Sequence, residues 1–163
     1  MKICVTGSLG FVGSSLIEQL LTNSYNVIAP IRKFNSLINT SNEKLKFTEI
    51  GNIDAKSNWS KSLYGVDCII HCAARSHIMK ETNKDPLNIY RKINVDGTCN
   101  LAEQAAEIGV KRFIYLSSIK VNGEQTFGSS SFKYNDIPKP EDAYGISKWE
   151  AEQNLWEISQ KTG

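Results

Sequence analysis

The stretch Met1-Lys-Ile-Cys-Val-Thr-Gly-Ser-Leu-Gly-Phe-Val-Gly-Ser14 decides the fold that we expect for this chain. It begins with a short apolar run at Ile3–Val5 and continues with glycines at every third position. Beyond Phe11 the apolar residues change to helical spacing, with Leu16 and Leu20 on one face. The stretch therefore predicts a strand, a tight turn and the first turns of a helix.

The three glycines give this turn the properties of an anion site. Unpaired N–H groups at a helix start, together with the positive end of its dipole, attract a phosphate. Gly7 permits the turn, Gly10 leaves space for a pyrophosphate, and Gly13 lets the helix pack close to the strand. The spacing is G-x-x-G-x-x-G rather than the G-x-G-x-x-G of the general dinucleotide fingerprint. A turn that binds nothing can have the same glycines, but the position after a strand and before a helix favours a nucleotide site.

Length and composition indicate one ordinary domain. The chain has 163 residues, of which 40% are hydrophobic and 22% charged, as is typical of a soluble globular protein. Its net charge of +2 gives no reason to expect nucleic acid or a membrane surface as a partner. No apolar run approaches membrane-spanning length, and the N-terminus enters a strand without a charged-then-apolar leader. These features predict a cytoplasmic protein.

The cysteines lie in apolar or helical segments. We expect buried free thiols rather than a disulfide framework or a zinc site, and therefore no metal centre. The four residues are Cys4, Cys68, Cys72 and Cys99.

Strand-like runs alternate with helical patterns along the whole chain, without internal repeats or a linker. Such alternation implies right-handed crossovers and a parallel sheet covered on both faces. The predicted fold class is α/β, a Rossmann-type doubly wound parallel sheet with helices on both faces, and its ligands bind beyond the carboxyl ends of the strands. We expect strands at residues 3–5, 27–31, 46–50, 66–72 and 112–116, and helices after residue 11, after residue 54, at 86–108 and at 144–161.

Two helix starts have capping signals. Asp54 is expected to cap a helix that carries Trp59, and Asp85 is expected to cap the long helix with Pro86 in its first turn. Residues 119–143 are irregular, and a loop of this length in a compact domain is usually functional.

Ser118, Tyr144 and Lys148 form a candidate proton-transfer site. Tyr144 and Lys148 are four residues apart, so on a helix they lie on one face. An ammonium near a phenol favours the phenolate. Ser118 follows the fifth predicted strand and can share a substrate oxygen with that phenol. Beside a nicotinamide cofactor, the three groups suit proton transfer at a secondary alcohol or ketone, with hydride transfer to or from the cofactor.

Five motifs in this order resemble the extended short-chain dehydrogenase/reductase family, in particular its nucleotide-sugar epimerase/dehydratase branch. The resemblance covers the whole chain and implies an enzyme with an NAD(P)-binding Rossmann domain over residues 1–163. It also implies NAD or NADP as cofactor and a nucleotide-sugar as substrate. The motifs are Thr6-Gly-Ser-Leu-Gly-Phe-Val-Gly13, His71-Cys-Ala-Ala74, Asn94-Val-Asp-Gly-Thr98, Ser117-Ser118 and Tyr144-Gly-Ile-Ser-Lys148.

The resemblance assigns roles to individual residues. It implies that Ser118, Tyr144 and Lys148 are the catalytic triad, with Tyr144 as acid or base and Lys148 also on the nicotinamide ribose. The remaining implied cofactor residues are Gly7, Gly10, Phe11, Val12 and Gly13 at the pyrophosphate, Ile53 and Asp54 at the adenine, Ala73 and Ala74 along the cofactor, and Asn94 behind the active-site helix.

Departures from the family pattern narrow the reaction. Relatives that eliminate water usually have an Asp-Glu pair after the catalytic hydroxyl, whereas here no carboxylate follows Ser118 before Glu124. This leaves 4-epimerisation or 4-keto reduction of a UDP-hexose or UDP-hexosamine, with a non-catalytic dinucleotide-binding module as the alternative. Family members usually continue for about as many residues again. We therefore expect a fragment without the substrate-binding domain, poorly active as it stands.

Some other polar residues leave alternatives open. Ile31 lies where NAD-preferring relatives have an acid, and Arg32 after it either accommodates the 2′-phosphate of NADP or stacks on adenine. His71 ends a buried strand and is expected to be packed rather than to act as a base. The loop residues His77 and Lys80 either reach a sugar or phosphate or are simply solvated, as loop charges usually are, and the same alternatives apply to Lys120.

Family members commonly form homodimers through two helices, which here correspond to residues 85–108 and 144–161. Their apolar residues exceed what one sheet face needs, and such a surplus often marks an interface. The residues concerned are Tyr90, Leu101, Ala105, Trp149 and Trp156.

Overall fold

The fold was obtained as a computed structural model, which describes residues 1–35, 38, 41–76, 85–126, 128 and 131–163. His77 and Lys80 lie outside the described residues.

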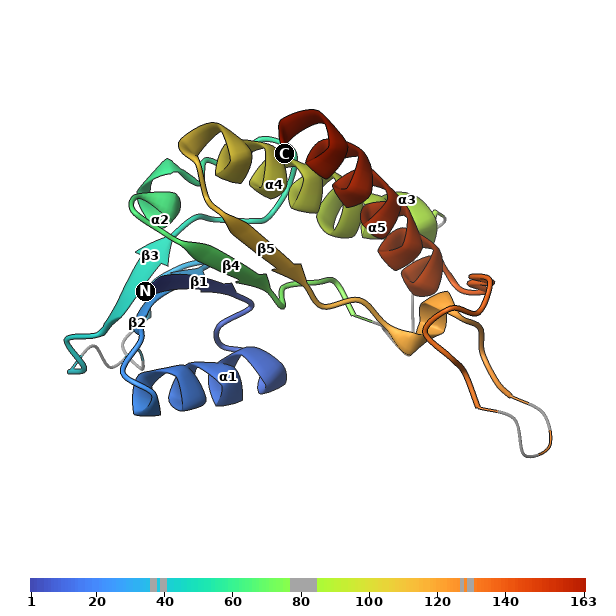
Figure 1. The fold of residues 1–163 in the computed structure, drawn as a ribbon, viewed down its shortest axis with the longest axis horizontal. Coiled ribbons are helices and arrows are strands. Elements are labelled where there is room, and N and C mark those ends of the chain that lie inside the picture. Colours follow the sequence, from blue (N-terminus) through green and yellow to red (C-terminus); the bar gives the residue numbers. More distant parts are fainter. Residues whose placement is uncertain (36–37, 39–40, 77–84, 127, 129–130) are drawn as a thin grey trace.

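Within the described residues, five parallel strands form one sheet in the order β3-β2-β1-β4-β5 (Figure 1). The order reverses at β1, so the carboxyl ends of β1 and β4 form the switch point at which doubly wound sheets bind ligands. The strands are β1 Lys2–Thr6, β2 Asn26–Ile31, β3 Leu45–Glu49, β4 Cys68–His71 and β5 Arg112–Tyr115.

Alternate residues of the central strands face opposite sides of the sheet, and each side has its own core. Ile3 and Val5 of β1 pack with Ile17 of helix α1, Phe11–Thr22. Cys4, between them, packs with Leu101 in the second core. Figure 1 shows α1 on one face of the sheet and the helices that follow β4 on the other. The predicted doubly wound fold, with strands buried on both faces, is confirmed.

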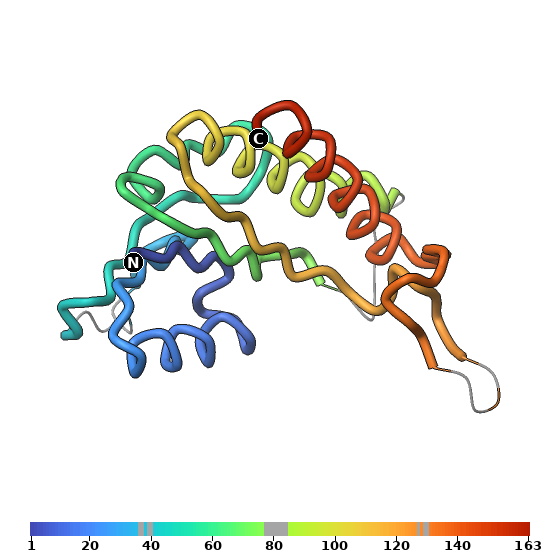
Figure 2. The backbone as a smooth tube through the Cα atoms, viewed as in Figure 1, coloured from blue at the N-terminus to red at the C-terminus, as the bar shows by residue number. Residues whose placement is uncertain are grey.

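The face opposite α1 is covered by the remaining helices, and Figure 2 shows two of them, α4 and α5, side by side over the sheet. The carboxylate of Asp85 accepts a hydrogen bond from the amide of Asn88 at 3.1 Å, which confirms the predicted start of the long helix. That helix contains a π-helical turn, η1, which the sequence did not predict. The elements are α2 Ser60–Leu63, α3 Pro86–Arg91, η1 Lys92–Asp96, α4 Gly97–Ile108 and α5 Ala143–Thr162.

The prediction that a helix starts at Asp54 is wrong. The Asp54 carboxylate accepts from the amide of Lys56 at 2.8 Å, and the Asp54 amide donates to Ser57 Oγ at 2.9 Å. Local bonds of this kind make a turn and compete with helix formation. Helix α2 begins only at Ser60, after the fully buried Trp59.

The four cysteines are free thiols, but the prediction that all are buried is wrong. Cys4 and Cys68 are buried, whereas Cys72 and Cys99 are half-buried. Cys72 lies just past the end of β4 and packs at the margin of the core that contains Ile3 and Val5. Cys99 lies on α4 beside the face that buries Leu101, so its side chain is only partly covered.

Most of the side chains expected at a dimer interface belong to the chain's own interior. Tyr90, Leu101 and Ala105 are only 3%, 0% and 4% exposed, so they offer no surface to a second copy. Trp149 is half-buried, and Trp156 is 67% exposed. The apolar surplus expected on these helices is therefore smaller than predicted.

Two kinds of feature are missing from the described residues. No helix among them has the length and apolar character needed to cross a membrane. They also contain no group of three or more His, Cys, Asp or Glu side chains that could hold a metal ion.

A buried histidine joins three elements of the fold. His71 at the end of β4 has Nδ1 2.6 Å from Thr6 Oγ1 in β1 and Nε2 3.0 Å from Thr98 Oγ1 in α4. Thr6 Oγ1 accepts from the amide of Ala73, so its own proton is available to Nδ1, and Nε2–H donates to Thr98. Burial, followed by the charge of Lys148, lowers the pKa of His71 to about 3. The imidazole is neutral and packed, as predicted.

Acidification should destabilise the fold through His71. The folded pKa of about 3 lies below the ordinary value of 6.5, so between these values the unfolded chain binds more protons. The free energy of unfolding should fall as the pH drops from about 6.5, with a contribution of up to about 1.4 kcal/mol per pH unit from this group. When the pH is lowered from neutral to about 5, the free energy of unfolding measured in urea should decrease less for His71→Gln than for the wild type. Equal losses would contradict this assignment.

Candidate active site

The predicted site residues follow the carboxyl ends of β1, β4 and β5 or lie at the start of α5. In the sheet, His71 of β4 pairs with Thr6 of β1 and with Tyr115 of β5. These three strands therefore end level with one another, and the segments after them meet at one edge of the sheet.

The turn after β1 brings three backbone segments into close contact. Gly7 has a φ of +65°, and a Cβ on it would lie 2.8 Å from the amide nitrogen of Ala73. A Cβ on Gly13 would lie 2.2 Å from the carbonyl oxygen of Gly7. A Cβ on Gly10 would lie 3.2 Å from that oxygen, which is a less severe contact. The fold therefore requires glycine at positions 7 and 13, whereas the steric demand for glycine at position 10 is weaker.

The start of α1 has the features of a phosphate site. Its N-cap is Gly10, without a side-chain capping bond, and its first turn carries no acidic residue. The first N–H groups of a helix have no intrahelical partner. Phe11 and Val12 in this first turn are 94% and 49% exposed. The pyrophosphate of a nicotinamide dinucleotide therefore fits this turn.

Ile53 and Asp54, predicted beside the adenine, are held against α4. A Cβ on Gly97 would lie 2.6 Å from Cγ2 of Ile53, and Asn100 Nδ2 donates to the Asp54 carbonyl at 3.1 Å. Arg32 follows β2 directly and is exposed. These residues therefore lie on the side of the switch point next to β2 and β3.

Ser118 is oriented by the short 3₁₀ helix η2, Ile119–Val121. Ser118 is the N-cap of η2, and its Oγ accepts a hydrogen bond from the amide of Lys120 at 3.2 Å. That bond uses a lone pair of the hydroxyl and leaves its proton available to another acceptor. Ser118 is thus able to donate to a substrate oxygen.

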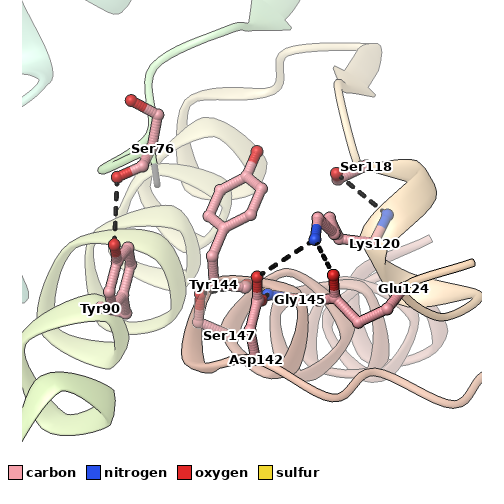
Figure 3. Close-up of polar contacts among 9 residues, drawn as sticks. All are labelled: Ser76, Tyr90, Ser118, Lys120, Glu124, Asp142, Tyr144, Gly145 and Ser147. Atoms are coloured by element: carbon pink, nitrogen blue, oxygen red, sulfur yellow. Dashed lines mark hydrogen bonds and ion pairs between the residues drawn. The ribbon is translucent and has the colours of Figure 1, made fainter. Parts of the chain in front are cut away.

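Tyr144 lies in the first turn of α5, which Asp142 caps. Asp142 Oδ1 accepts from the amide of Gly145 at 2.6 Å. The ring of Tyr90 packs edge-on against the ring of Tyr144, with centroids 6.2 Å apart. Figure 3 shows the Tyr144 hydroxyl pointing away from α5, on the side of the helix where Ser118 also lies.

Lys148 lies one helical turn after Tyr144 and is 2% exposed. Its ammonium donates to the Leu116 carbonyl at 2.6 Å and lies 3.9 Å from the centroid of the Tyr115 ring. Burial lowers the pKa of Lys148 to about 8. The structure therefore places a buried amine at the carboxyl end of β5, on the same helix as Tyr144.

Asn94 connects the loop after β4 to α5. This residue of η1 is 1% exposed, and its side-chain amide exchanges two hydrogen bonds with the backbone of Arg75, at 2.8 and 3.0 Å. Its Nδ2 also donates to Ser147 Oγ at 2.9 Å, and Ser147 donates to the carbonyl of Tyr144 at 2.8 Å. Asn94 therefore connects α5 to the backbone of Arg75, which directly follows Ala73 and Ala74 in the chain.

Sequence reasoning missed several groups that position the site. Asp142, three residues before Gly145, is a capping signal that could have been read from the sequence. Ser147 gives no such signal, because its partner Asn94 is far away in the chain. The expectation that Lys120 is a solvated loop charge is wrong, since its ammonium forms ion pairs with Glu124 and Asp142.

Comparison with known proteins finds nucleotide-sugar epimerases together with steroid dehydrogenases and a putative dihydroflavonol 4-reductase. Residues 3–163 match the NAD dependent epimerase/dehydratase family. A UDP-glucose 4-epimerase of Vibrio cholerae is 46% identical over 155 residues, which are 94% of this chain and 46% of that protein.

Two crystal structures share the fold. The UDP-glucuronic acid 4-epimerase of Bacillus cereus in complex with NAD is 28% identical, with a TM-score of 0.82 over 99% of this chain and 53% of that one. DesIV, a dTDP-glucose 4,6-dehydratase of Streptomyces venezuelae with NAD and TYD bound, is 29% identical, with a TM-score of 0.78 over 94% of this chain and 50% of that one. The chain thus spans about half the length of the relatives it matches.

The family match extends over nearly the whole chain, and both crystal structures contain NAD. The resemblance and the cofactor class that the sequence predicted are therefore confirmed for the family. The chain belongs to the NAD dependent epimerase/dehydratase family.

Proposed function

We propose that this chain forms the cofactor-binding and catalytic part of an NAD-dependent 4-epimerase that acts on a UDP-hexose or UDP-hexosamine. The observation that carries the proposal is the buried amine of Lys148 at the carboxyl end of β5, with Ser118 just after that strand and Tyr144 one turn earlier on the helix of Lys148. The similarity to the UDP-glucose 4-epimerase of Vibrio cholerae supports the choice of sugar nucleotide. The absence of a carboxylate between Ser118 and Glu124 favours epimerisation over elimination of water.

In this proposal the cofactor lies across the switch point of the sheet. A bound NAD supplies reversible hydride exchange at its nicotinamide ring. Its pyrophosphate is held by the backbone of Gly7–Gly13, its adenine by Ile53 and Asp54, and its nicotinamide ribose by Lys148. Ala73 and Ala74 leave room for it because their side chains are small.

The protein's own residues move the proton at the sugar C4. Tyr144 accepts the proton of the C4 hydroxyl while that carbon is oxidised and returns it when the carbon is reduced. Ser118 donates a hydrogen bond to the same sugar oxygen and keeps its own proton. Lys148, a cation below its pKa of about 8, stabilises the phenolate of Tyr144.

Other interpretations share parts of this chemistry. A 4-ketoreductase would use the same residues but consume one reduced cofactor per turnover, whereas an epimerase ends each cycle with its cofactor unchanged. Arg32 stays compatible with either NADP or NAD. The presence of Ser118, Tyr144 and Lys148 together favours an enzyme over a non-catalytic dinucleotide-binding module.

We also propose a homodimer formed through helices 85–108 and 144–161. Trp156 on α5 supports it, because a large aromatic side chain that is 67% exposed gains from burial against a second copy. The mass in solution at high protein concentration should be that of a dimer, and a strictly monomeric mass would reject the proposal.

Substitutions in the glycine turn should separate cofactor binding from folding. Gly10→Val should leave the fold intact but fill the space of the pyrophosphate. A loss of more than about tenfold in NAD affinity, equivalent to about 1.4 kcal/mol, is expected. Gly13→Ala should instead lower the thermal unfolding midpoint, because its Cβ would lie 2.2 Å from a backbone oxygen. Unchanged NAD affinity in folded Gly10→Val would refute the site.

Tyr144→Phe should remove turnover without removing cofactor binding. The substitution keeps the ring and its contact with Tyr90 but deletes the oxygen that carries the proton. We expect kcat to fall about a hundred- to ten-thousandfold in a protein that contains this chain and the remainder typical of its relatives. Lys148→Met should cost more, because it removes both the cation and a ribose contact. Near-normal turnover in Tyr144→Phe would favour the non-catalytic module.

A further inference from the structure

We infer that Lys120 is a positioning residue that holds the segment carrying Ser118 against the start of the helix carrying Tyr144. The inference rests on the proposed function of Ser118 and Tyr144, and it concerns a residue that touches neither the substrate nor the cofactor in that proposal. Contacts of its backbone and of its side chain carry the argument.

The backbone of Lys120 contacts both catalytic segments. Its amide donates to Oγ of Ser118 at 3.2 Å and so fixes the orientation of that hydroxyl. Its carbonyl oxygen lies against the first turn of α5, where a Cβ on Gly145 would come within 2.6 Å of it. Such a contact requires glycine and sets the distance between η2 and α5.

The side chain of Lys120 reaches the same helix start by a second route (Figure 3). Its ammonium pairs with Glu124 and lies 3.6 Å from Oδ2 of Asp142. The other oxygen of Asp142 accepts the capping hydrogen bond from Gly145 at 2.6 Å. Tyr144 lies between Asp142 and Gly145 in the chain. Lys120 therefore holds the carboxylate that caps the helical turn containing Tyr144.

The ion pairs of Lys120 are too exposed to contribute much to stability, which indicates that they serve to hold the geometry of the site. The side chains of Lys120, Glu124 and Asp142 are 33%, 36% and 24% exposed, and partly exposed pairs of this kind contribute little to stability. The hydrogen bond to Glu124 and the charges of Glu124 and Asp142 raise the pKa of Lys120 and outweigh desolvation, which lowers it, so the cation persists at neutral pH. Small displacements of a reacting group cost far more in rate than such a pair contributes to stability.

Steady-state kinetics of the complete protein with UDP-glucose test this inference. Lys120→Met keeps the aliphatic stem but removes the charge, and should lower kcat about ten- to hundredfold with KM, NAD affinity and the unfolding midpoint nearly unchanged. Lys120→Arg should restore most of the lost kcat. Lys161→Met is the matched control, because Lys161 pairs with Glu157 near the far end of α5 and is 74% exposed. Its kcat should equal that of the wild type.

A second measurement does not depend on turnover. Hydrogen exchange of the Gly145 amide reports the capping bond to Asp142, and Lys120→Met should accelerate this exchange whereas Lys161→Met should not. Unchanged exchange would overturn the inference even if UDP-glucose were not a substrate.

A double variant tests the route through Asp142. Asp142→Asn keeps a capping side chain but loses the charge. The pair of substitutions Lys120→Met and Asp142→Asn should then lower kcat no further than Lys120→Met alone, whereas additive losses would overturn this route. An increase in KM alone would also overturn the inference, because it would place Lys120 on the substrate. Normal turnover in Tyr144→Phe would instead reject the proposed function.

Discussion

The contact between the backbones of Gly7, Ala73 and Gly13 is the constraint on which the site depends. A Cβ at either glycine would come within 2.8 Å of main-chain atoms, and no change of rotamer relieves a clash between backbones. The contact fixes the end of β1 against the segment after β4 and sets the direction of the first N–H groups of α1. Thr6 and His71 lie directly behind it and hold it with hydrogen bonds. The same atoms therefore stabilise the fold and shape the turn that we propose binds the pyrophosphate.

Those parts of the fold and site that depend on local sequence could be predicted. Apolar runs buried on both faces specified parallel strands, and each expected strand lies within two residues of its observed bounds. The cap at Asp85 depends on neighbours within one turn, as does the spacing of Tyr144 and Lys148. All strands of a parallel sheet have their carboxyl ends at the same edge. The order of strands and helices therefore predicts that Ser118, Tyr144 and Lys148 lie at that edge.

Features set by contacts between distant segments could not be predicted. From the sequence, Leu101 and Tyr90 were predicted to be exposed at an interface, but both are buried within the chain, and the Tyr90 hydroxyl donates to the Ser76 carbonyl. The π-helical turn η1 has no sequence period of its own, and it includes Asn94, whose partner Ser147 is 53 residues away. The sequence suggests that Lys120 is a loop charge, because Asp142 is 22 residues away and the two come together only when η2 packs on α5. In each case the deciding neighbour is absent from the local pattern.

The burial of Lys148 shows that the fold does not account for the site by itself. A lysine that is 2% exposed gives up most of its hydration, and here it gains one carbonyl of Leu116 and the face of the Tyr115 ring. These partners do not offset the loss, since burial still lowers the pKa of Lys148 to about 8. An apolar side chain would fill the same space at lower cost. A buried amine with a shifted pKa, one helical turn from Tyr144, is the kind of feature that active sites have, and it supports the proposed role of that phenol.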